Sequence, residues 1–508
     1  MLKRINALLL ILISIFLVSC VDPTQDTSKD AKTLIIRKIT CSVGERVQIR
    51  VLNLEEGETV SFSYDSDAIY IEDGFVEGML AGQTVQVSAT SSKGGRGSFT
   101  VEVEEDNYSP TFDQSSWFNE INIDKVQNLR QDFPLGIDIS TLYEVLDKGG
   151  KFYNHEGLRQ NVYQILKNNG VNYVRLRLWN DPYKTVTQNG QEVKIPYGGG
   201  ICDLPRILEI ARSAKKAGLK VLLDFHYSDF WADPSKQVIP KAWLNYTTSD
   251  QIAQAIYDFT YQTIETLDKA GAKPDMVQIG NEITPGMIIH APGANEYIVE
   301  NSQPALSSAI RGSYSGASVN LKKYIKAGND AVKDYDSDIL TVIHLAKGMS
   351  GTDFIKEFFH TFDSIDYDVI GLSYYPYWHG TVSQLGNTVR ALAQEFPTKL
   401  ISIVEISYGF TYASHPNANN IFSPSGNAKP VSGYSVNPQG QADLLVDVIS
   451  TLSAVSQGYG IFYWEGCWIP VSGVGWAEAG TKNSWANQAL FSYDGKALPS
   501  LRVFKDIK

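Results

Sequence analysis

The stretch Pro274-Asp-Met-Val-Gln-Ile-Gly-Asn-Glu-Ile-Thr-Pro285 has the pattern of a short apolar β-strand that ends abruptly in Asn281 and Glu282. A carboxylate at the mouth of a buried strand is costly unless solvent or a polar partner satisfies it. A second apolar run, Lys399-Leu-Ile-Ser-Ile-Val-Glu405, ends in the same way. Two strands that each end in a glutamate predict a site in which two carboxyl groups act together.

Around these strands, residues 134–508 alternate apolar strands with amphipathic helices, which is typical of βαβ units in an α/β protein with a parallel sheet. Eight strands are expected, at residues 135–140, 173–179, 221–227, 276–282, 340–346, 369–375, 400–407 and 458–465. Helices are expected between them, including 158–169, 204–217, 252–270, 319–333 and 439–456. Eight such repeats predict a closed (β/α)8 TIM barrel. A doubly wound open sheet is the alternative, but no glycine-rich phosphate loop follows the first strand.

The barrel segment is longer than the roughly 250 residues that a minimal TIM barrel needs. The additional residues follow strands two, four, seven and eight, at 180–202, 283–318, 406–438 and 466–485. These connections leave the carboxyl ends of the strands, where barrel enzymes keep their active sites. Long loops at that face predict a groove that suits a polymer.

The first 20 residues have the pattern of a signal peptide, with Lys3 and Arg4 before an apolar run that is too short to span a membrane. The run ends in Leu17-Val-Ser-Cys20, which resembles the bacterial lipobox, so we expect Cys20 to be the lipidated first residue of the mature protein. An ordinary secretion signal with a chance cysteine is the alternative. Residues 21–33 are polar and are expected to form a tether.

Residues 34–105 form short alternating runs separated by glycines, which predicts a small all-β sandwich of the immunoglobulin-like kind. The clearest runs are 47–51, 60–64, 85–89 and 99–103. A spacer is the simplest role for this domain; a carbohydrate-binding module is the alternative, although the segment contains no Trp. Residues 106–133 are a junction in which we expect a short helix near residues 123–128.

The composition limits the classes of partner. The chain has 508 residues and a net charge of −12, which repels phosphate backbones and anionic membrane surfaces. We therefore expect no nucleic-acid partner, and membrane contact only through the N-terminal lipid. No two of the four cysteines have the CxxC spacing that is typical of zinc or redox sites. Cys202 and Cys467 could be bridged in an exported protein, but the sequence does not place them within bonding distance.

Polar and amphipathic residues recur at the carboxyl ends of the predicted strands. Side chains of one parity face the barrel interior and converge above it. The residues expected to face the interior are Asp138, Arg175, Arg177, Asp224, His226, Tyr375 and Trp464. Each alone is equally well explained as a structural residue, because Asp138 and the arginines could simply neutralise one another. Together with Glu282 and Glu405 they indicate glycoside hydrolysis, in which one carboxyl group protonates the leaving oxygen and the other attacks the sugar carbon.

Several motifs resemble the arabinogalactan endo-β-1,4-galactanase family, glycoside hydrolase family 53. They are Val174-Arg-Leu-Arg-Leu-Trp179, Gly280-Asn-Glu282, Gly371-Leu-Ser-Tyr-Tyr-Pro376 and Tyr463-Trp-Glu465. The resemblance extends over most of residues 134–508 and does not include the sandwich. It implies an endo-acting, retaining hydrolase of β-1,4-galactan, the pectic arabinogalactan chain, with Glu282 as acid/base and Glu405 as nucleophile.

The resemblance also implies roles for other residues. Asn281 would hydrogen-bond the sugar 2-hydroxyl, Arg177 would hold Glu405 ionised, and Tyr375 would donate to the same carboxylate. Asp138 and His226 are further substrate-binding candidates, and stacking surfaces are expected from Trp464, Trp378 and Trp231.

No cofactor is implied. Some members of the family hold calcium in the loop after strand seven, but residues 406–440 contain no Asp or Glu here, so we expect no metal at that loop. The expected protein is a monomeric outer-membrane lipoprotein, exposed at the cell surface, that acts on β-1,4-galactan. A barrel hydrolase of another β-linked glycan and a non-catalytic glycan-binding protein are the alternatives.

Overall fold

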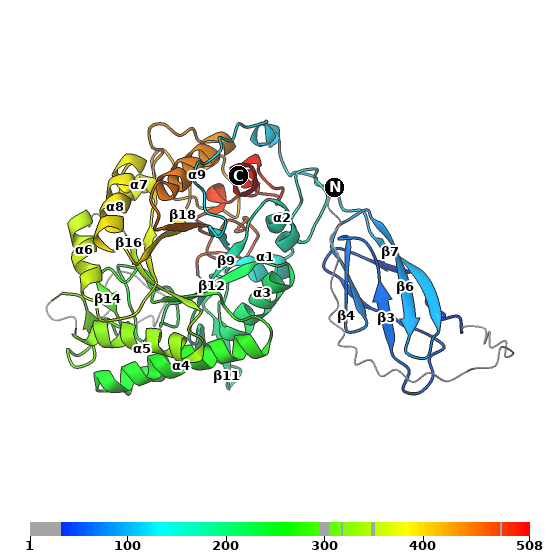
Figure 1. The fold of residues 1–508 in the computed structure, drawn as a ribbon, viewed down its shortest axis with the longest axis horizontal. Coiled ribbons are helices and arrows are strands. Elements are labelled where there is room, and N and C mark those ends of the chain that lie inside the picture. Colours follow the sequence, from blue (N-terminus) through cyan, green and yellow to red (C-terminus); the bar gives the residue numbers. More distant parts are fainter. Residues whose placement is uncertain (1–31, 294–303, 316–318, 347–350, 478–479) are drawn as a thin grey trace, which may run out of the picture.

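Eight parallel strands close into a barrel that is ringed by helices, and a small all-β domain precedes it (Figure 1). The computed structural model describes residues 32–293, 304–315, 319–346, 351–477 and 480–508. The barrel order is β12-β13-β16-β17-β18-β19-β8-β9. The predicted TIM barrel is therefore confirmed, and the open sheet is wrong.

The barrel strands lie where the apolar runs predict them, and their ends differ from the predicted ones by at most three residues, at β13. They are β8 (Leu135–Asp138), β9 (Tyr173–Leu178), β12 (Lys220–Phe225), β13 (Met276–Ile279), β16 (Leu340–Ala346), β17 (Val369–Ser373), β18 (Leu400–Ile406) and β19 (Gly458–Tyr463). The backbone register pairs Asp138 with Arg175 and Arg177 with Asp224. Opposite charges thus lie side by side inside the barrel.

The helices pack their apolar faces against the outside of the barrel. They are α1 (Leu142–Asp147), α2 (Val162–Asn168), α3 (Leu204–Lys216), α4 (Ser249–Lys269), α5 (Val319–Tyr335), α6 (Thr352–His360), α7 (Pro376–His379), α8 (Val382–Glu395), α9 (Pro438–Ser453) and α10 (Val503–Asp506). Helix α4 begins with a capping box, in which Thr248 and Gln251 satisfy each other's backbone N–H groups. Such caps fix where the helices begin.

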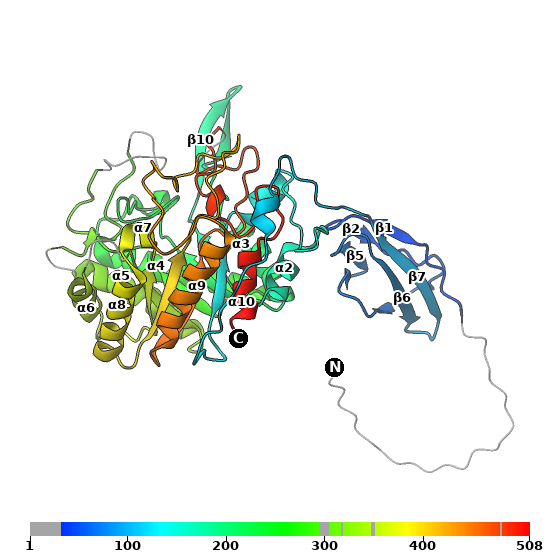
Figure 2. The same ribbon diagram turned by 90° about the horizontal axis from the view of Figure 1, so that it is seen from above.

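The loop after β9 contains a β-hairpin that is absent from the strands predicted from the sequence. Strands β10 (Tyr183–Gln188) and β11 (Gln191–Pro196) pair antiparallel, and Figure 2 shows them standing out from the barrel. The turn is Asn189-Gly190, with φ of 51° and 76°. Positive φ at both positions is the type I′ geometry that Asn-Gly favours. A second short pair, β14 (Gly286–Met287) and β15 (Gly312–Ser313), lies in the loop after β13.

The N-terminal domain has two sheets, ordered β1-β7-β6-β3 and β2-β5-β4. Its strands are β1 (Ile39–Cys41), β2 (Arg46–Gln48), β3 (Val60–Ser63), β4 (Ile69–Glu72), β5 (Phe75–Gly78), β6 (Thr84–Ser91) and β7 (Arg96–Val103). Val76, Val87 and Val101 are fully buried in its core. The prediction of a small all-β domain is confirmed.

The junction follows the barrel surface instead of forming the expected helix near residues 123–128, so that prediction is wrong. Its backbone bonds to the barrel: the Asn122 N–H donates to the Gln439 side chain at 2.8 Å and the Val126 N–H to Ile507 O at 3.0 Å. The helical turn η1 (Ser115–Phe118) lies earlier. It inserts Trp117 against Phe410 of the barrel, with ring centroids 5.0 Å apart.

The predicted signal peptide, Cys20 and residues 21–31 of the tether lie outside the described residues. Within the described part, we find no helix with the length and apolar character needed to cross a membrane.

The cap of α4 gives a test of helix stability. Replacing Thr248 with Ala removes the side-chain acceptor and should lower the free energy of unfolding by about 1 kcal/mol, measured as a lower urea midpoint. Thr247→Ala is the matched control, because the Thr247 hydroxyl has no capping contact. Equal midpoints for the two variants would contradict the assignment.

Candidate active site

A pocket of about 590 Å³ opens at the carboxyl ends of the barrel strands. Most of the predicted site residues line it, namely Arg175, Arg177, His226, Trp231, Asn281, Glu282, Tyr375, Trp378, Glu405 and Trp464. Asp138 does not. It is fully buried, with its carboxylate bonded to Arg175 at 2.7 Å and to the Ser140 hydroxyl at 2.6 Å. Its prediction as a substrate contact is wrong, because both of its oxygens are engaged beneath the pocket.

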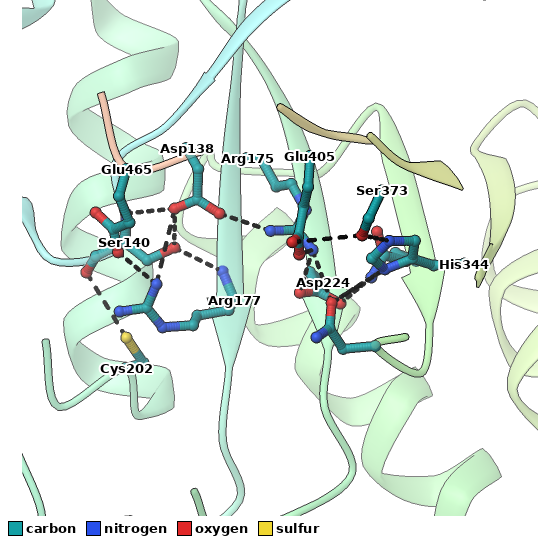
Figure 3. Close-up of polar contacts among 12 residues, drawn as sticks. Asp138, Ser140, Arg175, Arg177, Cys202, Asp224, His344, Ser373, Glu405 and Glu465 are labelled. Carbon is teal, nitrogen blue, oxygen red and sulfur yellow. Dashed lines mark hydrogen bonds and ion pairs between the residues drawn. The ribbon is translucent and has the colours of Figure 1, made fainter. Parts of the chain in front are cut away.

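The two glutamates meet across the pocket at a shared hydroxyl. Ser373, the last residue of β17, donates to Glu282 Oε1 at 2.6 Å and lies 3.5 Å from Glu405 Oε2. Figure 3 shows Ser373 beside Glu405. These contacts place the two carboxylate oxygens within about 6 Å of each other, which favours the roughly 5–5.5 Å spacing of a retaining pair. An inverting pair is wider, with roughly 6.5–9.5 Å between its carboxyl groups.

Arg175 holds the nucleophile candidate. Its guanidinium is buried and donates to Asp138 at 2.7 Å, to Asp224 at 2.8 Å and to Glu405 Oε1 at 2.9 Å. It also donates to Asn281 Oδ1 at 2.9 Å. A planar fork suits such a set of acceptors better than an ammonium group does.

The prediction that Arg177 holds Glu405 is wrong, because its guanidinium turns the other way (Figure 3). It pairs with Glu465 just beyond β19, and it donates to the Thr141 hydroxyl at 2.9 Å. Its Cζ lies 4.1 Å from the centroid of the Trp231 ring. Arg177 therefore supports an aromatic side of the pocket through a cation–π contact.

Tyr375 donates to Glu405 Oε2 at 2.9 Å, as predicted. Burial raises the pKa of Glu405 to about 7, while Arg175 and Tyr375 oppose that rise by stabilising the anion. Burial and the charge of Glu405 raise the pKa of Glu282 well above its ordinary value. Glu405 therefore loses its proton first, which leaves Glu282 protonated, the state that a general acid needs.

A short relay orients the acid. The Glu282 backbone N–H donates to His344 Nδ1 at 3.2 Å, so the ring proton resides on Nε2, 2.9 Å from Ser373 Oγ. The Ser373 hydroxyl accepts that proton's hydrogen bond and donates its own to Glu282 Oε1. Glu282 Oε2 is thus left to carry the transferable proton. Neither His344 nor Ser373 was among the residues predicted from the sequence.

The side chains of His226 and Asn281 are fixed in position by hydrogen bonds to neighbouring groups. His226 Nδ1 accepts from the Trp179 indole at 3.1 Å and from the Ala232 N–H at 3.0 Å, so Nε2 carries the proton and faces Asp224 at 3.2 Å. Asn281 Nδ2 donates to Ala232 O at 2.8 Å. Its contact with a sugar 2-hydroxyl stays a prediction.

Aromatic rings line the pocket. Trp231 is stacked on Trp476, with centroids 4.5 Å apart and planes at 10°, and Trp464 packs on Trp485 at 4.5 Å. Trp378 is 40% exposed and so presents an open face. Trp476 and Trp485 were not predicted, because they lie in the long loop after β19.

Cys202 and Cys467 do not form the disulfide bond that the sequence left open. Cys202 and Cys467 are both free thiols, and both are buried. Among the described residues, no group of three His, Cys, Asp or Glu side chains is arranged to hold a metal ion. The expectation of no calcium in the loop after β18 stays a prediction.

Comparisons with known proteins agree with this geometry. The model of glycosyl hydrolase family 53 matches residues 134–504. The endo-beta-1,4-galactanase of Bacillus subtilis (strain 168) is 34% identical over 414 residues, covering 75% of this chain and 88% of the relative. The arabinogalactan endo-beta-1,4-galactanase of Cellvibrio japonicus is 31% identical over 381 residues, covering 73% and 90%. The solved Ignisphaera aggregans GH53 catalytic domain is 39% identical with a TM-score of 0.65, covering 76% and 99%.

The two arginines can be separated by substitution. In Arg175→Lys a single ammonium cannot reach all four acceptors, so kcat/KM for glycan hydrolysis should fall at least about 100-fold. The acidic limb of the pH profile should move to higher pH, because the guanidinium lowers the pKa of Glu405. Arg177→Lys is the control and should lose no more than about 10-fold. A larger loss for Arg177→Lys would contradict these roles.

The relay predicts a shift in the basic limb of the pH profile. The Ser373 hydroxyl lowers the pKa of Glu282, so Ser373→Ala should move that limb to higher pH by about one unit. Ser402→Ala is the control, since Ser402 Oγ is bonded to Gly460 O at 3.1 Å within the barrel. An unchanged basic limb in Ser373→Ala would exclude the relay.

Proposed function

The chain belongs to glycosyl hydrolase family 53, and on that premise we propose that it is an endo-acting, retaining hydrolase that cleaves the β-1,4-galactan of pectic arabinogalactan to galacto-oligosaccharides. The observation that carries this proposal is the pair Glu282 and Glu405, which share the Ser373 hydroxyl at 2.6 and 3.5 Å. The named activity of the Bacillus and Cellvibrio relatives supports the substrate.

The first chemical step forms a glycosyl ester. Glu282 Oε2 gives its proton to the glycosidic oxygen while a Glu405 oxygen attacks the anomeric carbon, and the bond from that carbon to the leaving chain breaks. Arg175 and Tyr375 hold Glu405 ionised and aligned until it reacts. The leaving chain departs with a new hydroxyl group.

The second step returns the enzyme to its starting state. Once Glu405 is an ester its negative charge is gone, so the pKa of Glu282 falls and the carboxyl group, now ionised, takes a proton from water. The water oxygen attacks the anomeric carbon, and the ester bond to Glu405 breaks. Two inversions leave the sugar with its original β-configuration.

The surface of the pocket suits a neutral polymer. The indoles that line it offer flat faces for sugar rings, and its two arginines are occupied by buried carboxylates. Long loops bound the open face, which fits binding in the middle of a chain rather than at its end.

Further proposals concern the rest of the chain. The lipobox at Cys20 supports a lipoprotein anchored to the outer membrane and exposed at the cell surface, where a polymer too large for pores is accessible. The two sheets of the N-terminal domain support an immunoglobulin-like sandwich. We propose that the protein acts as a monomer.

Product analysis tests the activity. The wild type should release galacto-oligosaccharides of several lengths from β-1,4-galactan and no product from arabinan, mannan or xylan. Glu405→Ala should lose at least about 1,000-fold in rate, because the covalent step has no nucleophile. Glu265→Ala is the control, since this surface glutamate pairs with Lys269 on α4, away from the pocket. Absence of galacto-oligosaccharides, or full activity in Glu405→Ala, would refute the proposal.

Anchoring is tested separately. Cys20→Ala should leave the membrane fraction and should not incorporate a labelled lipid precursor. A Cys20→Ala protein that stays with the membrane would show that the lipid is not the anchor.

A further inference from the structure

A second cavity, of about 330 Å³, lies between the small β domain and the barrel. It shares no lining residue with the active-site pocket. The β domain contributes Val43, Gly44 and Glu77, and the barrel contributes residues on or near α1, α2 and α3. This interdomain cleft is at the lower end of the size range of small-molecule sites, about 300–1,000 Å³.

The sides of the interdomain cleft are fixed by backbone contacts between the domains. The Ala81 N–H donates to Arg159 O at 2.9 Å, and the Asn161 N–H donates to Met79 O at 2.8 Å. Asp106 adds ion pairs to Lys151 at 2.8 Å and Arg159 at 3.2 Å. The cleft therefore belongs to a built interface rather than to a loose contact.

One buried hydroxyl in the cleft has no partner. Tyr163 is 5% exposed, and its hydroxyl makes no hydrogen bond among the described residues. The Ser213 and Tyr143 hydroxyls are close enough to act on its pKa but lie outside hydrogen-bonding geometry. These two hydroxyls are 3.3 Å from each other. An unsatisfied buried hydroxyl costs about 1–3 kcal/mol. A ligand that brings its own hydroxyl groups would remove that cost.

A carboxylate completes the cleft. Glu77, on β5, lines it together with these hydroxyls, and its side chain makes no hydrogen bond or ion pair among the described residues. Burial raises the pKa of Glu77. The cations that act on Glu77 have other contacts: Lys216 pairs with Glu72, and Arg46 donates to Glu72 O at 3.5 Å and lies over the Phe75 ring. The charged groups that line the cleft are paired as well, Lys151 and Arg159 with Asp106 and Asp147 with Arg206 at 2.5 Å. Both cations that line the cleft already pair with Asp106, which disfavours an anion, whereas a neutral polyol would find one strong acceptor and several hydroxyls.

We propose that the interdomain cleft is a second, non-catalytic carbohydrate site that binds a galactosyl unit of the substrate. The choice of sugar rests on the proposed function, while the preference for a neutral polyol rests on the cleft itself. Glu77 accepts hydrogen bonds from the sugar hydroxyls, and Tyr163 gains its missing partner. Such a site holds the polymer close to the enzyme and so raises its local concentration at the active site. The small domain would then contribute to binding as well as act as a spacer.

Binding of β-1,4-galactotriose to the full-length Glu405→Gln protein tests the proposal. Isothermal titration calorimetry should give two sites per chain. Adding Tyr163→Phe or Glu77→Gln should weaken one site at least 10-fold and leave the other unchanged. Tyr163→Phe should fold normally, because the hydroxyl that it removes has no hydrogen-bond partner. Glu56→Gln, which changes an exposed carboxylate of the same domain, is the matched control.

Several results would overturn the proposal. They are a single site per chain, two sites that both survive Tyr163→Phe and Glu77→Gln, or a cleft site that binds xylotriose as tightly as galactotriose. Failure of the proposed function gives a different result, since the wild type would then release no galacto-oligosaccharides from galactan whatever binds in the cleft.

Discussion

The guanidinium of Arg175 is the interaction on which the rest of the site depends. It is buried inside the barrel and contacts groups from four strands or strand ends, namely Asp138, Asp224, Asn281 and Glu405. A desolvated cation is tolerated only with such partners, and the partners in turn need the cation. The network that neutralises the barrel interior is therefore also the network that positions Glu405, the proposed nucleophile.

Three non-glycine residues with positive φ lie at the carboxyl ends of the barrel strands. Tyr227, Glu282 and Glu465 follow β12, β13 and β19, and they have φ of 48°, 47° and 49°. Non-glycine residues adopt this conformation only where surrounding contacts enforce it. For Glu282 those contacts are His344 and Ser373, and for Glu465 the pairing with Arg177. The backbone turns sharply at each point, and two of these turns place a carboxylate at the top of the barrel.

The barrel and the meeting of Glu282 and Glu405 in one pocket were predictable from the sequence, because apolar strands are interrupted where a polar residue faces the site. That Arg175 and not Arg177 holds Glu405 was not predictable, since both have the same parity and only the direction of each guanidinium separates them. Ser373 and His344 are common residue types in strands and carry no distinguishing pattern. The Asn189-Gly190 pair is itself a hairpin signal, so β10 and β11 were predictable from the sequence although they lie inside a long loop. The junction lacks a helix because its N–H groups bond to the barrel instead.

The central claim is that Glu405, held by Arg175, forms the covalent bond to the sugar while Glu282 moves the proton. The most direct measurement is peptide mass spectrometry of the wild type after inactivation by an activated 2-deoxy-2-fluoro-β-galactobioside, which slows hydrolysis of the ester. We expect one fluorogalactobiosyl group per chain, attached to Glu405. A label on Glu282, on Glu465 or on any other residue would contradict it.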